Sequence, residues 1–187
     1  TVVDLFAGCG GSALGVEAAL AELGISMKTG LAVDFEKTAC AVFQDNFPNA
    51  NVLCAGVESL FSSELGGRIT EKEKRIKKMV GNVDILIGGP PCQGHSDLNN
   101  YTRRNDGKNK LYSYMARAAK ILRPQYIIIE NVQGLPHDKS DVLKTTTQSL
   151  EKDGYDISMG LVDLVRLGVP QKRRRHIVLA SKTKRLR

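Results

Sequence analysis

A cysteine in a stiff, glycine-rich turn is the first residue of this sequence that could do chemistry. Cys92 stands in GGPPCQGHS, residues 88–96, directly after the apolar run VDILI. The two prolines restrict the backbone, and the glycines let another molecule approach it closely. A thiol just past a buried strand is where an α/β sheet places catalytic groups. Cys92 is therefore a candidate nucleophile, and the alternative is a small buried thiol in an ordinary turn.

Charged residues near two other predicted strands could act with such a thiol. Glu130 ends the run QYIIIE, whose apolar residues are expected to desolvate it partly and make it a usable acid. The alternative for Glu130 is a solvated residue at a loop entrance. QKRRR precedes the strand HIVLA. If this segment is extended, Arg173 and Arg175 face one side while Lys172 and Arg174 face the other.

A second glycine-rich turn indicates a ligand site. In DLFAGCGGSALG, a strand is predicted to end at Phe6, and Gly8, Gly10 and Gly11 turn into a helix. Such a turn brings the backbone close to a ligand beside a helix N-terminus. Asp34 ends the second predicted strand, where acidic residues bind ribose hydroxyls. Together these features indicate an adenosine-type cofactor, although the glycine spacing fits the GxGxxG of hydride-transfer enzymes poorly.

The sequence does not favour a metal site. Its four cysteines form no CxxC pair, and its three histidines (His95, His137 and His176) are dispersed without ligand-spaced partners. No secretory signal is visible, so we expect reduced thiols in a bacterial cytoplasm or a nucleus, and not a secreted protein.

Apolar and helical segments alternate along the sequence and must position these groups. Strands are predicted at residues 1–6, 29–35, 50–57, 83–89, 125–132, 155–164 and 174–180. Helices are predicted at residues 8–24, 36–47, 71–79, 110–123 and 140–154. In the first of these, Ser12 could cap the helix and Gly24 could end it. The alternation predicts an α/β fold with a mostly parallel sheet and helices on both faces.

Composition agrees with one soluble globular domain. A chain of 187 residues with 42% hydrophobic and 25% charged residues buries roughly 70% of its unfolded surface. No apolar run approaches the ~20 residues that span a bilayer. The net charge of +7 suits a polyanionic partner. The run EKEKRIKKM alternates in sign and is expected to form a solvated helix face.

Five segments in this order resemble the ordered motifs of the cytosine-C5 DNA methyltransferases, bacterial type: DLFAGCGG, VDFEKTA, GGPPCQGHS, ENVQGL and PQKRRR. The resemblance runs from residue 4 to residue 180. It implies a Rossmann-like, S-adenosylmethionine-dependent catalytic domain over residues 1–187. It also implies double-stranded DNA as the partner, from which a cytosine is flipped, and no membrane.

The resemblance also implies catalytic roles. The cysteine of PPCQ, here Cys92, adds to C6 of the cytosine, and the glutamate of ENV, here Glu130, holds or protonates N3. Arg175 matches an arginine that contacts the base near O2, and Arg173 is implied to help order the site.

Further site residues follow from the same motifs. Those implied to bind the cofactor are Phe6, Ala7, Gly8, Gly10, Gly11, Asp34, Phe35, Val57, Pro90 and Leu111. Those implied to contact the base or the DNA are Pro91, Gln93, Ser96, Arg103, Arg104, Asn131, Val132 and Gln171.

The sequence also departs from the family pattern. Asp34 stands where the family usually has Glu. Where the family often has an Asp that binds the adenine amino group, this sequence offers Gly56 and Val57, with Glu58 as a candidate substitute. The target-recognition region and the last two motifs do not occur within these 187 residues. A C-terminal region or a second chain is expected to supply target recognition.

The sequence also leaves other functions open. RNA cytosine-C5 methylation uses the same chemistry, and a +7 charge serves either polymer. A nucleic-acid-binding fragment that is catalytically incomplete is the alternative from another class. A nicotinamide-dependent oxidoreductase is disfavoured by the glycine spacing and by the absence of a catalytic Lys or Tyr constellation.

Overall fold

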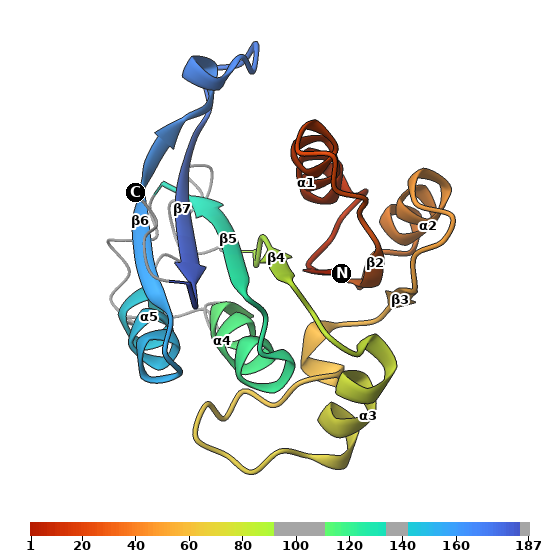
Figure 1. The fold of residues 1–187 in the computed structure, drawn as a ribbon, viewed down its shortest axis with the longest axis vertical. Helices are drawn as coiled ribbons and strands as arrows, with labels where there is room; N and C mark the ends of the chain where they lie inside the picture. The colour runs from red at the N-terminus through yellow and green to blue at the C-terminus, as the bar shows by residue number, and fades with distance from the viewer. Residues whose placement is uncertain (92–110, 134–141, 184–187) are drawn as a thin grey trace, which may run out of the picture.

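The structure is a computed structural model that describes residues 1–91, 111–133 and 142–183. Strands and helices alternate through these residues (Figure 1). In chain order they are β1 (Val2–Leu5), α1 (Gly11–Glu22), β2 (Thr29–Asp34), α2 (Lys37–Asn46), β3 (Val52–Cys54), η1 (Val57–Ser59), α3 (Glu71–Val80), β4 (Ile85–Gly88), α4 (Leu111–Leu122), β5 (Tyr126–Val132), α5 (Val142–Lys152), β6 (Asp156–Asp163), η5 (Leu164–Leu167) and β7 (Arg174–Ser181). None of these helices is long and apolar enough to cross a membrane.

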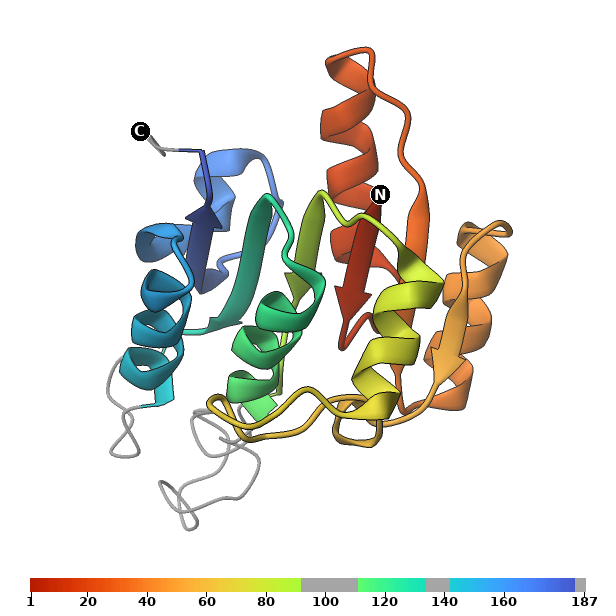
Figure 2. The ribbon, with the colours of Figure 1, turned by 60° about the horizontal axis from the view of Figure 1, so that its bottom comes forward.

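The described strands form one seven-stranded sheet in the order β3-β2-β1-β4-β5-β7-β6. Strands β3, β2, β1, β4 and β5 pair in parallel, whereas β7 pairs antiparallel with β5 and with β6. Figure 2 shows the arrowheads of β1 and β7 pointing in opposite directions. The carboxyl ends of β1, β2, β4 and β5 therefore meet at one edge of the sheet, where β7 begins. This topology confirms the predicted Rossmann-like α/β fold with a mostly parallel sheet.

Helices cover both faces of the sheet and produce two separate cores. Helices α1 and α2 lie on one face, and α3, α4 and α5 lie on the other (Figure 1). Side chains of a strand alternate between the faces, so Val2 of β1 joins the core under α1 and α2. Val3 and Leu5 join the larger core under α3, α4 and α5. Burial on both faces explains why the strands are apolar runs.

The first helix begins differently from the prediction and ends as predicted. Its N-cap is Gly10, in a left-handed conformation with φ 94°, and no side chain caps the helix. Ser12 therefore lies inside the first turn, and its prediction as the cap is wrong, because the glycine turn enters the helix earlier. Gly24 follows the helix end with φ 69°, the left-handed conformation for which glycine was predicted there.

The charged run at residues 71–79 forms α3, but it is not a solvated face throughout. Glu71 and Lys74 do form an exposed ion pair at 2.6 Å. Glu73, two residues after Glu71, is fully buried and pairs with the equally buried Arg117 of α4. The expectation of a wholly solvated face is therefore wrong at Glu73.

The Glu73–Arg117 pair is satisfied by hydrogen bonds on every side. Arg117 Nε and Nη2 each donate to one carboxylate oxygen of Glu73 at 2.7 Å. Its remaining N–H groups bind the backbone carbonyls of Glu64, Gly67 and Arg68 at 2.8–2.9 Å. A buried ion pair is stable only with such complete pairing. The pair thereby ties the segment before α3 to α4.

This pair predicts acid sensitivity of the fold. Burial by itself raises the pKa of Glu73, but hydrogen bonds from Arg117, Thr70 and Ser62 outweigh it and lower the pKa to about 2. A carboxylate with a lowered folded-state pKa stabilises the fold above its ordinary value of 4.5, and this contribution is lost as pH falls towards 2. We expect Glu73 to account for a loss of about 3 kcal/mol across that window. Urea titrations at successive pH values measure it.

The matched variant is Glu73→Gln. It leaves Arg117 without its counter-charge in the core and is expected to lower the free energy of unfolding at neutral pH by about 3 kcal/mol. It should also flatten the dependence of stability on pH between 4.5 and 2. Equal slopes for the two proteins would contradict this account of Glu73.

Candidate active site

The glycine-rich turn after β1 has the left-handed backbone that its composition predicts. Gly8 and Gly10 have φ values of 53° and 94°, and Phe6 has the unusual value of 61° for a residue with a side chain. A Cβ atom added at Gly8 would meet no atom within 4 Å. One added at Gly10 would lie 2.8 Å from the ring of Phe47. Gly8 therefore faces open space, whereas Gly10 packs closely against the end of α2.

Asp34 joins this turn to the end of β2. Its Oδ2 accepts a hydrogen bond from the Gly8 N–H at 2.8 Å, and its Oδ1 accepts one from the Glu36 N–H at 2.9 Å. Because a carboxylate offers about four acceptor sites, lone pairs remain for ligand hydroxyl groups. The residues predicted to bind ribose and to form the turn are thus held in direct contact.

The same edge of the sheet fits an adenosine-type ligand. An added Cβ at Gly11, like one at Gly8, would meet no atom within 4 Å, so a ligand can approach the backbone. Phe35 follows Asp34, and 70% of its surface is exposed, which is unusual for an aromatic residue. Stacking on a base would cover this ring.

Other residues predicted to bind the cofactor lie deeper. Ala7 and Pro90 are buried, and Leu111 is half-buried at the first position of α4. Val57 is 2% exposed and belongs to the larger core, so its backbone rather than its side chain is left for a ligand. The carboxylate of Glu58 lies over Gly56, where it would meet an added Cβ.

The Pro90 turn is fixed to the end of β5 by a buried amide. Asn131 is 2% exposed, and its Nδ2 donates to the Pro90 carbonyl at 3.0 Å. Its Oδ1 accepts from the Val132 N–H at 2.8 Å. Gly88 is also constrained, because an added Cβ would lie 2.6 Å from the Leu5 carbonyl oxygen. The backbone between β4 and the predicted nucleophile segment is therefore fixed in position at Gly88 and Pro90.

Glu130 forms an ion pair with Arg175 at the same edge. Arg175 Nε lies 2.5 Å from Glu130 Oε1, and the two side chains are 19% and 37% exposed. Antiparallel pairing of β5 with β7 places Glu130 opposite Ile177 and Val132 opposite Arg175. Glu130 is thus half-buried, as its apolar neighbours predicted, and remains accessible from solvent.

The arginines around the start of β7 separate as an extended segment requires. Arg174 turns away from Glu130 and pairs with Asp163 of β6 at 3.7 Å. Arg173 is exposed just before the strand, and its carbonyl accepts from the Leu164 N–H. Of the residues predicted to contact substrate, Gln171 is exposed, whereas Pro91 and Val132 are half-buried.

Several predicted site residues lie outside the described residues. They are Cys92, Gln93, Ser96, Arg103 and Arg104. Pro91 is the last described residue before them, next to the Pro90 carbonyl that Asn131 holds.

No metal cluster occurs within residues 1–91, 111–133 and 142–183. Nowhere in these ranges do three His, Cys, Asp or Glu side chains gather to hold an ion. Of the three histidines, only His176 falls within them. It is buried in β7, and burial lowers its pKa.

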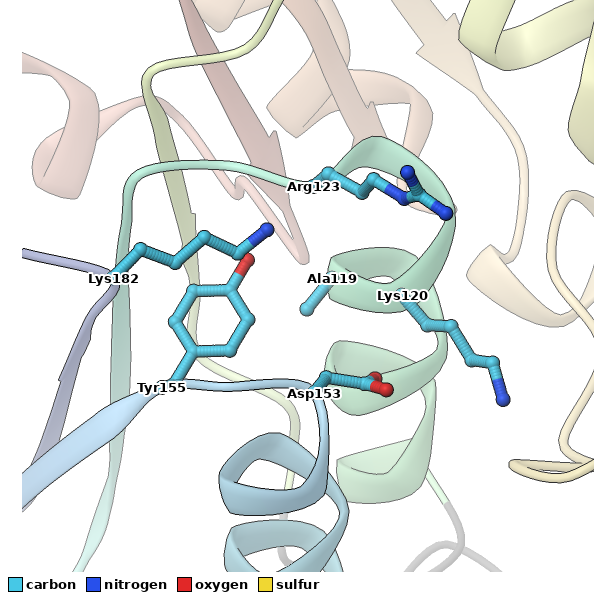
Figure 3. Close-up of a pocket in the computed structure, with 6 residues that line it drawn as sticks. All are labelled: Ala119, Lys120, Arg123, Asp153, Tyr155 and Lys182. Atoms are coloured by element: carbon cyan, nitrogen blue, oxygen red, sulfur yellow. The ribbon is translucent and has the colours of Figure 1, made fainter.

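A cavity of about 300 Å³ lies elsewhere, at the ends of α4 and α5 (Figure 3). It is lined by Ala119, Lys120, Arg123, Asp153, Tyr155 and Lys182. Tyr155 donates to the Pro124 carbonyl at 2.7 Å, and the Lys182 ammonium lies 5.0 Å from the centre of its ring. The cavity adjoins the start of β5, so it does not belong to the site at the carboxyl ends.

Comparison with known proteins identifies the family. The model of the C-5 cytosine-specific DNA methylase family matches residues 1–186. The chain belongs to this family. A crystal structure of a prophage-encoded E. coli protein described as a DNA modification methyltransferase superposes with a TM-score of 0.74 at 29% identity, covering 97% of this chain and 46% of that one.

Curated relatives of this C-5 cytosine methylase chain include two bacterial enzymes. Type II methyltransferase M1.BsuMI of Bacillus subtilis is 41% identical over 97% of the chain, and type II methyltransferase M.XorII of Xanthomonas oryzae is 36% identical over 96%. The chain spans 43% and 40% of their respective lengths.

Sequence reasoning missed Asp4 of this methylase chain. Asp4 lies in the middle of β1, 1% exposed, and its Oδ2 makes no hydrogen bond within the described residues. Burial, together with the nearby charge of Asp34, raises its pKa to about 8. The sequence does place an acidic residue within the apolar run TVVDLF, which could have indicated a buried carboxyl group. The run alone does not show on which face of the sheet Asp4 lies.

Gly10 offers a test of the turn, with Gly8 as the matched control. Both glycines have positive φ, so alanine at either position strains the backbone. Only at Gly10 would the new methyl also meet Phe47 and Phe43. We expect Gly10→Ala to lower the free energy of unfolding by about 2 kcal/mol more than Gly8→Ala, measured by urea titration. Equal losses would show that the packing against α2 is not what requires a glycine.

Proposed function

We propose that this chain is the catalytic part of a DNA cytosine-C5 methyltransferase. It would transfer a methyl group from S-adenosylmethionine to C5 of a cytosine flipped out of double-stranded DNA. The observation that carries the proposal is the Glu130–Arg175 pair beside the Pro90 turn, in a chain of the C-5 cytosine methylase family. The net charge of +7 favours a polyanionic substrate.

The turn after β1 and the end of β2 form the cofactor site in this proposal. When bound, S-adenosylmethionine would supply a methyl group from its positively charged sulfur and would be left as S-adenosylhomocysteine. Asp34 accepts hydrogen bonds from the ribose while it keeps the Gly8 N–H. The exposed ring of Phe35 would pack against the adenine. Gly8 and Gly11 leave room for the ligand beside the start of α1.

Cys92 is the nucleophile, two residues beyond Pro90. Its thiolate adds to C6 of the cytosine, which makes C5 electron-rich enough to attack a methyl group. Loss of the C5 proton to a base then allows the thiolate to leave. Asn131 acts as a positioning residue because it fixes the Pro90 carbonyl from β5. Small errors in the position of a nucleophile strongly reduce its rate.

Glu130 and Arg175 hold the base during this addition. Glu130 holds a proton at N3, so that negative charge does not accumulate on the ring as sulfur adds. Arg175 fixes Glu130 through Nε and donates from Nη1 to the Arg174 carbonyl at 2.9 Å. Its Nη2 makes no hydrogen bond within the described residues and is the group that we assign to O2 of the base.

Target recognition is assigned to chain beyond these residues. The curated relatives are more than twice as long as this chain. A C-terminal region or a second chain would supply the contacts that select a DNA sequence. Arg103, Arg104 and Gln171 would contribute contacts to the DNA itself.

Neighbouring arginines give a matched test of this mechanism. Arg175→Ala removes the partner of Glu130, whereas Arg174→Ala removes an arginine that faces the other side and pairs with Asp163. We expect Arg175→Ala to lower kcat for transfer of tritiated methyl groups to DNA by about 10²-fold or more. Affinity for S-adenosylmethionine, measured by calorimetry, should stay within about threefold, because Arg175 lies away from the turn after β1.

Arg174→Ala is expected to keep kcat within about threefold of the unmodified protein. Glu130→Gln should reproduce the loss seen with Arg175→Ala, since the two side chains act as one unit. Equal effects of the two arginine variants would contradict the assignment of Arg175 to the reacting base.

A further inference from the structure

Two cysteines outside the proposed catalytic machinery meet beside the turn that carries Asp34 and Phe35. Cys40 is the fourth residue of α2, and Cys54 is the last residue of β3. Helix α2 packs against β3 at the end of the sheet (Figure 1). In the parallel pairing of β2 with β3, Cys54 lies directly opposite Asp34.

Both thiols contact consecutive carbonyls of that turn. The Cys40 S–H donates to the Asp34 carbonyl at 3.3 Å, and the Cys54 S–H donates to the Phe35 carbonyl at 3.7 Å. Neither of these two thiols is in a disulfide. Two thiols from different elements, α2 and β3, thus bind neighbouring carbonyls of one turn.

The two thiols differ in access to solvent. Cys54 is exposed, whereas Cys40 is 7% exposed. Burial and the contact with Cys54 raise the pKa of Cys40 to about 11. Cys54 is therefore the thiol that a dissolved reagent reaches first, and Cys40 is a protonated partner poised behind it.

We propose that Cys40 and Cys54 form a redox-sensitive dithiol whose closure to a disulfide weakens cofactor binding. This proposal rests on the proposed function in one respect only, namely that the turn of Asp34 and Phe35 binds the cofactor. The oxidant that it requires is a low-molecular-weight disulfide of the glutathione type.

The exchange is balanced in two steps. The Cys54 thiolate attacks one sulfur of the oxidant and forms a mixed disulfide, and the other sulfur leaves as a thiolate that takes a proton. Cys40 then gives its proton to solvent and attacks the Cys54 sulfur, which releases the second thiol. Two protein thiols are oxidised to one disulfide, and one small disulfide is reduced to two thiols.

Closure changes the turn because it consumes both S–H donors. The carbonyls of Asp34 and Phe35 lose the hydrogen bonds that the thiols now supply. Asp34 also holds the Gly8 N–H, so a shift of this residue reaches the glycine-rich turn. The ribose and adenine contacts in the proposed site would be displaced together.

The first test is chemical and independent of the cofactor. The purified protein is incubated with oxidised glutathione, free thiols are alkylated, and the digest is analysed by mass spectrometry. We expect a linked peptide pair containing Cys40 and Cys54 that disappears on treatment with dithiothreitol. Cys54→Ser should abolish it, whereas Cys9→Ser, at an exposed cysteine outside the pair, should leave it unchanged. Glutathione adducts without a Cys40–Cys54 link would overturn the proposal.

The second test measures the effect of the disulfide on cofactor affinity. Calorimetry with S-adenosylmethionine should give an affinity about tenfold weaker for the oxidised protein than for the reduced one, and no difference for Cys54→Ser under the same treatment. A linked protein with unchanged affinity would overturn the coupling to the cofactor. If the reduced protein does not bind S-adenosylmethionine, the proposed function fails, and the linked peptide still decides whether the dithiol closes.

Discussion

Parallel pairing from β3 to β5 is the constraint on which the candidate site depends. Because β1, β2, β4 and β5 run in one direction, the segments that follow them all emerge at one edge of the sheet. The glycine turn, Asp34, the Pro90 turn and Glu130 are far apart in the sequence and become neighbours for this reason. Direct hydrogen bonds then fix them in pairs, Gly8 with Asp34 and Pro90 with Asn131. The helices on both faces make this arrangement stable by burying the strands on each side.

Strand β7 runs antiparallel to β5 and brings its first residues to the same edge of the sheet. Its first residues lie where β5 ends, so an arginine near the start of β7 can meet a glutamate near the end of β5. The resulting Glu130–Arg175 ion pair is half-buried, so the two side chains are held together and still remain accessible from solvent. On the far side of the sheet, Arg117 organises the chain before α3 with the same kind of pairing, but it is wholly enclosed and serves stability. Exposure therefore distinguishes the two glutamate–arginine pairs: the Glu130–Arg175 pair is open to a ligand, and the Glu73–Arg117 pair is enclosed.

Local pattern predicted most of the fold and much of the candidate site. Alternating apolar runs identified the strands, and strand ends identified Asp34 and Glu130, because those signals depend on neighbouring residues alone. The two-sided placement of Arg174 and Arg175 followed from the geometry of an extended chain. Contacts between segments that are distant in the sequence could not be predicted in this way. Glu73 has the same charged neighbours as a solvated residue, and only the fold shows that it pairs with Arg117 of α4, 44 residues away. The contact of the Asn131 amide with the Pro90 carbonyl was likewise not predicted, because only the sheet brings these two residues together.

The central claim is that a cysteine of this chain adds covalently to cytosine, and trapping that adduct tests it most directly. Random-sequence DNA duplexes carrying 5-fluorocytosine in place of cytosine would be incubated with the protein and S-adenosylmethionine. Fluorine at C5 cannot leave as a proton does, so the adduct should persist and be visible by mass under denaturing conditions. The account predicts a covalent complex with the unmodified protein and none with Cys92→Ala. An adduct that survives in Cys92→Ala would contradict it, as would no adduct from a protein that binds both the cofactor and the duplex.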